Sequence, residues 1–290
     1  MRIANLNDRA TVLLPGARCY DIATESRGAY GPDITTVYEN WSAFLAWSSA
    51  HEPSSTVPYS EDALKPVSPA PRQVFAIGLN YSDHAAETGL AVNREFPPVF
   101  AKWQSSLARP HGTVAVPEDS HVDWEVELVV VMGKQARDVS RTQAMDYVAG
   151  FTVGQDYSDR KVQFVGQAPQ FGLAKSFAGF SPVGPALVTA DEAGDLTSNR
   201  ITCEVDGVLK QDGTLGQMIF PVTEIIEILS RIVTLYPGDL IFTGTPSGVG
   251  FGRSPREFLK PGQRVVSTIE GIGRISQNVV LRPAREGQAE

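Results

Sequence analysis

The segment that most restricts the fold is VDWEVELVVVMG, residues 122–133, where two glutamates run directly into an unbroken apolar stretch. Its valines and aromatic residue predict a β-strand, and the continuous apolar run predicts a strand buried on both faces. Alternate residues of a strand share a face, so Glu125 and Glu127 point the same way, with Cβ atoms roughly 6.5 to 7 Å apart. The alternation also fits a half-buried strand with an exposed acidic strip, and the pattern alone leaves both interpretations open.

If the strand is buried, its two carboxylates need a positive partner. They repel each other and are costly to remove from water unless a cation compensates them. Mg²⁺, Mn²⁺ and Ca²⁺ prefer oxygen ligands, so a divalent metal is the natural candidate. A third carboxylate follows the strand-like residues 151–155: Asp156 can reach the same cleft, and Asp159 competes for that role. Either aspartate can instead cap a helix or occupy a turn.

Strand patterns dominate the rest of the chain, at residues 147–156, 201–210 and 263–280 among others. Helices are expected at residues 41–49, 136–147 and 220–234, with a short helical stretch within residues 77–89. The helix expected at residues 220–234 carries an amphipathic face formed by Val222, Ile225, Ile226 and Leu229. Because the helices are few and do not alternate regularly with strands, a doubly wound sheet or a (β/α)8 barrel is disfavoured, and a β-rich α+β fold is predicted.

A change in composition divides the chain. Residues 51–72 are rich in proline and serine, which is typical of a linker or an extended surface segment. We therefore predict a small N-terminal region, residues 1–70, that contains short strands and ends in this segment. The larger unit, residues 71–290, carries the candidate chemistry.

Charge and cysteine content exclude several classes of function. The 290 residues carry a formal net charge of -8, which disfavours nucleic acid and a polybasic membrane anchor as partners. The sequence has no apolar run long enough for a transmembrane helix and no secretory signal pattern. Its two cysteines and four histidines match no disulfide framework or zinc motif. A reduced, cytoplasmic location is the resulting expectation.

Two further segments contain candidate catalytic groups. In GLNYSDHAAETG, residues 78–89, His84 and Glu87 are three residues apart, so on a helix they share a face and can form a general base that acts on water. An exposed His–Glu pair without a role fits equally. Lys175 can bind a substrate oxygen or lie along the surface. The small residues of IFTGTPSGVG, residues 241–250, allow backbone N–H groups to approach a carboxylate or oxyanion, or form a plain turn.

Taken together and in this order, the motifs resemble the fumarylacetoacetate hydrolase family over roughly residues 72–283. The single motifs are weak, and the ordered set is specific. Besides the segments already quoted, the resemblance rests on FPPVFAKW, GFTVGQDYSDRKVQ, LAKSFAGFSPVGP, VDGVLKQDGT and YPGDLIFTGTPSGVG.

The resemblance implies a catalytic domain of rolled, mixed β-sheets, assembled as a homodimer. It implies Mg²⁺ or Mn²⁺, with Ca²⁺ as a further option, held by the ligands Glu125, Glu127 and Asp156. It also implies a catalytic group of His84 and Glu87, on a segment that closes over the substrate, and Lys175. Thr245, in the TGTPSGVG turn, is the implied contact of the substrate carboxylate, and Gln211, in the KQDGT turn, is a second candidate for a substrate contact.

The implied reaction is hydrolysis of a carbon–carbon bond in a β-diketo acid of the acylpyruvate or fumarylpyruvate type. The same site also fits an oxaloacetate decarboxylase or tautomerase, or a 2-oxo-enoate hydratase. Two departures from the family pattern, Ala178 in KSFAGF and Trp103 after Lys102, affect the expected substrate more than the chemistry. A glycosidase that uses Glu125 and Glu127, and a binding protein without catalysis, are the alternatives from other classes.

Overall fold

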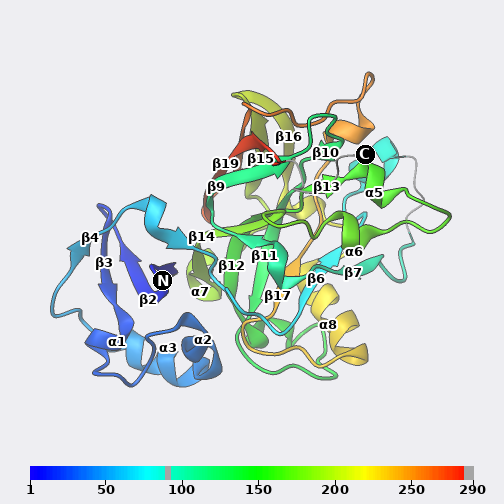
Figure 1. Ribbon diagram of the computed structural model, residues 1–290. Coiled ribbons are helices and arrows are strands. Elements are labelled where there is room, and N and C mark those ends of the chain that lie inside the picture. The colour runs from blue at the N-terminus through cyan, green and yellow to red at the C-terminus, as the bar shows by residue number, and fades with distance from the viewer. Residues whose placement is uncertain (89–92, 284–290) are drawn as a thin grey trace.

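The computed structural model describes residues 1–88 and 93–283. A large mixed sheet runs from the N-terminal strands into the strands of the larger unit (Figure 1). Within the described residues the sheet has twelve strands. Along the main path the order is β4 (Val57–Pro58), β3 (Arg18–Asp21), β2 (Arg9–Leu14), β1 (Arg2–Leu6), β14 (Ser181–Thr189), β12 (Val148–Gln155), β11 (Val126–Met132), β17 (Leu240–Phe242), β6 (Val74–Ile77) and β7 (Val99–Ala101). Two short strands lie off this path: β5 (Leu64–Lys65) pairs with β1, and β8 (Leu107–Ala108) pairs with β14.

A second sheet of five strands covers part of the first. Its order is β16 (Val208–Thr214), β15 (Arg200–Val205), β18 (Arg264–Ile269), β19 (Gly273–Leu281) and β9 (His111–Val116). A separate two-stranded ladder joins β10 (Val122–Asp123) to β13 (Ser158–Asp159). Both larger sheets are mixed, because β17 pairs in parallel with β6, and β19 pairs in parallel with β9, whereas most other pairs are antiparallel. The expected β-rich α+β fold with mixed sheets is confirmed.

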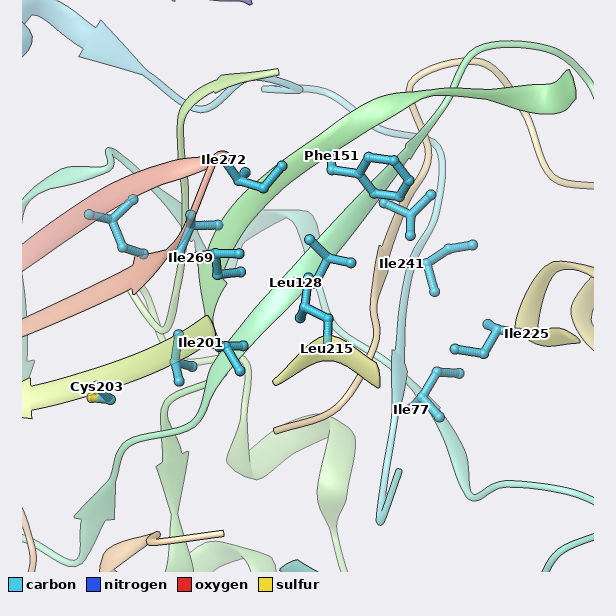
Figure 2. Close-up of a cluster of buried hydrophobic side chains, with 14 of the residues drawn as sticks. Ile77, Leu128, Phe151, Ile201, Cys203, Leu215, Ile225, Ile241, Ile269 and Ile272 are labelled. Atoms are coloured by element: carbon cyan, nitrogen blue, oxygen red, sulfur yellow. The ribbon is translucent and has the colours of Figure 1, made fainter. Parts of the chain in front are cut away.

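The main hydrophobic core lies between the two sheets (Figure 2). Leu128 and Phe151 contribute from the large sheet, and Ile201 and Ile269 from the five-stranded sheet. Ile225 completes the core from α8 (Val222–Ile232). Because β11 has this core on one face and Val129 and Val131 in a second core on the other, the strand is buried on both faces, as its apolar run predicts.

The N-terminal region adds three helices, α1 (Ile22–Glu25), α2 (Ile34–Glu39) and α3 (Trp41–Ser49), which pack on the strands that begin the chain (Figure 1). The helix α3 has the bounds predicted from the sequence. The segment expected to be a linker contains β4 and β5, which pair with β3 and β1. Since β1 also pairs with β14, the N-terminal region continues the sheet of the larger unit. The boundary at residue 70 stays a prediction.

The two long helices predicted in the larger unit have different outcomes. The helix α8 is confirmed, with Ile225, Ile226 and Leu229 on its buried face. The helix expected at residues 136–147 is wrong: only Ala144–Tyr147 form one short 3-10 turn there. Asp138 adopts a left-handed conformation, with φ of 52°, and its backbone N–H donates to Ser230 O at 3.0 Å. This tertiary hydrogen bond and the left-handed conformation of Asp138 outweigh the helical pattern of the segment.

The remaining helices are short. They are α4 (Ser82–Thr88), α5 (Arg160–Gln163), α6 (Phe171–Ala174), α7 (Ala190–Ala193) and the 3-10 helices Glu61–Ala63, Gln104–Ser106, Leu215–Gln217 and Gly250–Gly252. In the part of the chain that the structure describes, no helix has the length and apolar character needed to cross a membrane.

Candidate active site

Three buried carboxylates meet where β11 begins and β12 ends. Glu125 lies one residue before β11, Glu127 lies within it, and Asp156 follows β12 directly. The two strands are antiparallel, with Val126 opposite Gln155, so the start of one strand adjoins the end of the other. One oxygen of each carboxylate lies within 4.8 Å of the others. Since all three residues are buried, the interpretation of an exposed acidic strip is excluded.

Two buried lysines contact this cluster. Lys175, directly after α6, places Nζ 2.5 Å from Glu125 Oε2 and 2.5 Å from Asp156 Oδ2. The alternative of a surface lysine is therefore excluded. Lys102, directly after β7, donates to the other oxygen of Asp156 and to the backbone oxygen of Lys175, the latter at 2.5 Å. In the sequence Lys102 stands out only through its neighbour Trp103, so its place in the site is a finding of the structure.

An arginine and a fourth carboxylate complete the charged network. Arg160, the first residue of α5, donates from Nη2 to Glu125 Oε1 at 2.7 Å and to Asp123 Oδ2 at 2.8 Å. Asp123 also accepts from the backbone N–H groups of Gly250 and Phe251, at 2.7 and 2.9 Å. Neither Arg160 nor Asp123 is among the site residues predicted from the sequence. The alternation of Asp123, Glu125 and Glu127 at every second position was the available signal for the aspartate.

The charged network of Lys175 and Arg160 stabilises the ionised form of Glu125, whereas Glu127 has less positive charge nearby. Burial acts to raise the pKa of Glu125, but Lys175 and Arg160 outweigh it and lower that pKa to about 2. Burial and then the charge of Asp156 raise the pKa of Glu127 well above its usual value. The backbone N–H of Gly244 donates to Glu127 Oε2 at 2.8 Å. A buried cluster of carboxylate oxygens with one uncompensated member fits a hard divalent cation such as Mg²⁺ or Mn²⁺.

His84 and Glu87 form the pair that their spacing predicts. On α4, His84 Nδ1 lies 2.8 Å from Glu87 Oε1, and the backbone N–H of Gly248 donates to Glu87 Oε2 at 2.9 Å. The side chain of His84 is 8% exposed and that of Glu87 is 17% exposed, so an exposed surface pair is excluded. The segment expected to close over the substrate comprises residues 81–92, of which residues 89–92 lie outside the described part of the chain.

The turn at residues 243–250 binds mostly the protein's own groups. Its N–H groups at Gly244 and Gly248 donate to Glu127 and Glu87, as given above. Thr245 Oγ1 donates to Val126 O at 2.9 Å and accepts from Gln211 Nε2 at 2.7 Å. Thr245 borders the cavity described below, whereas the amide of Gln211 is engaged with the backbone of Val126 and Pro246. A direct substrate contact by Gln211 stays a prediction.

One cavity of about 370 Å³ brings these groups together. Its charged end contains His84, Glu125, Glu127, Arg160 and Lys175, and its other walls are mainly apolar and aromatic. Asp159, the competitor of Asp156, is not part of the carboxylate cluster. Its side chain caps α5 by accepting from the N–H groups of Lys161 and Val162, as the alternative reading of that residue expects.

Comparison with known proteins agrees with this geometry. Residues 73–280 match the family model described as fumarylacetoacetate (FAA) hydrolase, C-terminal. The mitochondrial oxaloacetate tautomerase FAHD2B of Bos taurus is 45% identical over 218 residues, which cover 75% of this chain and 69% of that protein. A solved structure of a Mycobacterium smegmatis protein described as HpcE has 46% identity and a TM-score of 0.91, covering 98% of this chain and 100% of that one.

A second solved structure holds ligands. It is maleylpyruvate hydrolase from Sphingobium sp. SYK-6 in complex with manganese(II) ion and pyruvate, with 26% identity and a TM-score of 0.80, covering 98% of this chain and 100% of that one. The expected cytoplasmic location stays a prediction, because curated relatives include mitochondrial proteins. The family match, the identities and the shared architecture agree: this chain belongs to the fumarylacetoacetate hydrolase family.

Proposed function

We propose that the protein is a metal-dependent hydrolase that cleaves the carbon–carbon bond of an acylpyruvate, a 2,4-diketo acid. The observation that carries the proposal is that the His84–Glu87 pair and the carboxylate cluster border the same cavity. A base beside a candidate metal site is what hydrolysis of a chelating diketo acid requires. A neighbour in complex with manganese(II) and pyruvate supports the same chemistry.

Glu125, Glu127 and Asp156 would hold the metal, which we propose to be Mg²⁺ or Mn²⁺. When bound, such an ion supplies a Lewis acid that stabilises negative charge on the oxygens of a 2-oxo acid. The raised pKa of Glu127 supports this assignment, because a divalent cation would add positive charge to the partial effect of Lys175 and favour the ionised carboxylate.

The protein's own groups perform the proton transfers. Glu87 fixes the orientation of the His84 ring through Nδ1, so that Nε2 removes a proton from water. The water oxygen bonds to the distal carbonyl carbon C4, and the C3–C4 bond breaks with its electron pair on C3. Protonation at C3 then yields pyruvate and a carboxylic acid. The ammonium of Lys175 stabilises negative charge on the substrate oxygens, and Thr245, whose hydroxyl donates to Val126 O, borders the same cavity.

Oxaloacetate tautomerisation is the second candidate. It is favoured by the 45% identity to the oxaloacetate tautomerase of Bos taurus. In this reaction His84 would move a proton between C3 of the 2-oxo acid and its enol oxygen, so a C3–H bond is exchanged for an O–H bond and no carbon–carbon bond is broken. The two functions differ in product, since only hydrolysis releases pyruvate.

The deciding experiment follows acetylpyruvate and oxaloacetate by ultraviolet absorbance and assays pyruvate directly. Chelator-treated protein is compared with the same protein after Mg²⁺ or Mn²⁺ is restored. Metal-dependent loss of acetylpyruvate with one pyruvate formed for each molecule consumed supports the hydrolase. Rapid keto–enol exchange of oxaloacetate without acetylpyruvate cleavage establishes the second candidate, and turnover of neither compound refutes both.

A further inference from the structure

We propose that the aromatic half of the active-site cavity is a subsite for an uncharged, apolar acyl group, alkyl or aryl, on the diketo acid. This inference rests on the proposed function and specifies its substrate class. It excludes as preferred substrates those whose acyl group ends in a second carboxylate, such as fumarylpyruvate.

Two aromatic pairs from four separate segments border the cavity. Phe100 of β7 stacks on Phe171 of α6, with ring centroids 5.6 Å apart. Phe164, at the end of α5, stacks on Phe251 with centroids 5.1 Å apart. Ligand pockets are lined in this way when apolar surface supplies affinity and a few polar groups fix the orientation.

The aromatic rings directly adjoin the charged end. Lys175 Nζ lies 5.1 Å from the ring centroid of Phe100, and the guanidinium carbon of Arg160 lies 5.6 Å from that of Phe251. A 2-oxo acid head that contacts Lys175 and the carboxylate cluster therefore directs its acyl group toward the phenylalanines. The order of the groups along the cavity matches the order of the groups along an acylpyruvate.

The cations that border the cavity already have carboxylate partners. Arg160 donates to Asp123, Glu125 and the side-chain oxygen of Gln163, and Lys175 contacts Glu125 and Asp156. Of the described residues that line the cavity, Arg160 and Lys175 are the only arginine and lysine. Arg256 also approaches Phe251, with its guanidinium carbon 4.0 Å from the ring centroid, but it does not border the cavity. A second carboxylate placed against the rings inside the cavity would therefore lose water without meeting an unpaired lysine or arginine among the described lining residues, and that transfer is strongly unfavourable.

An apolar acyl group would also cover exposed ring surface. Phe164 is 42% exposed, although its partner Phe251 is partly buried. Apolar area removed from water contributes about fourfold in affinity for each buried methylene. The gain should therefore appear as a steady rise in affinity with chain length until the subsite is full.

Calorimetric titration of the manganese-loaded full chain with unreactive 2-oxo acids tests this. The apolar series is pyruvate, 2-oxobutanoate and 2-oxohexanoate, and 2-oxoadipate matches 2-oxohexanoate in carbon number but ends in a carboxylate. We expect affinity to rise about fourfold per methylene along the series, and 2-oxoadipate to bind at least about tenfold more weakly than 2-oxohexanoate. Equal or tighter binding of 2-oxoadipate overturns the inference.

Phe164→Ala tests the location of the subsite. We expect the affinity ratio of 2-oxohexanoate to pyruvate to fall about fivefold in this variant, in line with the loss of an aromatic contact. Leu209→Ala, a change at a residue on β16 that is 45% exposed and does not border the cavity, is the control and should leave the ratio unchanged. An unchanged ratio in Phe164→Ala places the acyl group elsewhere and overturns the assignment.

The test of the apolar subsite can fail or succeed independently of the test of the proposed hydrolase function. If apolar 2-oxo acids bind as expected but no acylpyruvate is cleaved, the subsite stands and the hydrolase assignment fails. If acetylpyruvate is cleaved but affinity does not rise with chain length, the hydrolase stands and the subsite fails. If pyruvate and all its homologues fail to bind, both are overturned.

Discussion

Replacing Glu127 by glutamine should stabilise the metal-free protein, and only at higher pH. The pKa of Glu127 is raised in the folded protein, by burial and then by Asp156. A carboxyl group with a raised pKa holds its proton more tightly in the folded chain than in the unfolded chain. Its contribution to stability is therefore fully present below the unfolded pKa, whose reference value is 4.5, and is lost as the pH rises toward the folded pKa.

The size of the effect follows from proton linkage. Each pH unit between the unfolded and folded pKa values removes about 1.4 kcal/mol. Between about pH 5.5 and about pH 7.5, the wild-type protein should lose stability relative to Glu127→Gln, by no more than the roughly 3 kcal/mol that one proton can contribute over two pH units. For a chain of this size that corresponds to roughly 5 °C in melting temperature. The glutamine oxygen can still accept from the N–H of Gly244, so the local hydrogen bond is retained.

Thermal unfolding of chelator-treated protein, followed by tryptophan fluorescence at both pH values, measures this difference. Mn²⁺ should raise the melting temperature of the wild type at the higher pH and have little effect on Glu127→Gln. Glu204→Gln, on β15 of the five-stranded sheet, is the matched control and should follow the wild type. Parallel pH profiles for wild type and Glu127→Gln would refute the assignment of Glu127 as the uncompensated carboxylate.

Three further substitutions test other parts of the site. His84→Ala should lower the cleavage rate by a factor of about 10² to 10⁴. Its manganese affinity, measured by paramagnetic resonance titration, should stay within about twofold of the wild-type value. A cleavage rate near that of the wild type excludes His84 as the base. Asp123→Asn should cost about 3 to 5 kcal/mol in urea unfolding, because it removes a buried charge partner of Arg160; a loss below about 1 kcal/mol contradicts this. Lys175→Met leaves Glu125 and Asp156 with less positive charge nearby, so the metal-free variant should have a lower melting temperature than the wild type. Mn²⁺ should raise the melting temperature of the variant more than that of the wild type. An equal rise in melting temperature argues against the ammonium of Lys175 as a partner of the carboxylate cluster.

The sequence predicts those elements whose stability is largely local or strongly patterned. The helix at residues 41–49 and the amphipathic helix around Ile225 follow from side-chain spacing, and the buried strand at Val126–Met132 follows from its apolar run. Residues 136–147 carry a helical pattern but form a loop, because the N–H of Asp138 donates to Ser230, about ninety positions away. Such a long-range contact produces no periodic pattern in the sequence around the residues that it orders.

The same distinction applies to the site. Glu125 and Glu127 are recognisable because alternation on one strand places them on one face. Lys102 and Arg160 are not recognisable, since their role depends on how β7 and α5 approach the end of β11. Gln211 differs again: a motif implied a substrate contact, which stays a prediction, and the structure adds that its amide binds the backbone of Val126 and Pro246. Motifs therefore locate the site better than they assign the role of each member.

The charged network itself is a physical argument for a chemical role. Asp123, Glu125, Glu127 and Asp156 lie buried beside Lys102, Lys175 and Arg160, in the interior of a strand-rich core. Buried ion pairs contribute little net stability, and apolar side chains of similar size are often as stable or more so. Glu127 adds a direct cost, since burial and the charge of Asp156 disfavour its ionised form. A cluster that costs stability and borders a cavity together with a His–Glu pair is explained by cation binding and catalysis, whereas a purely structural role leaves Glu127 unexplained.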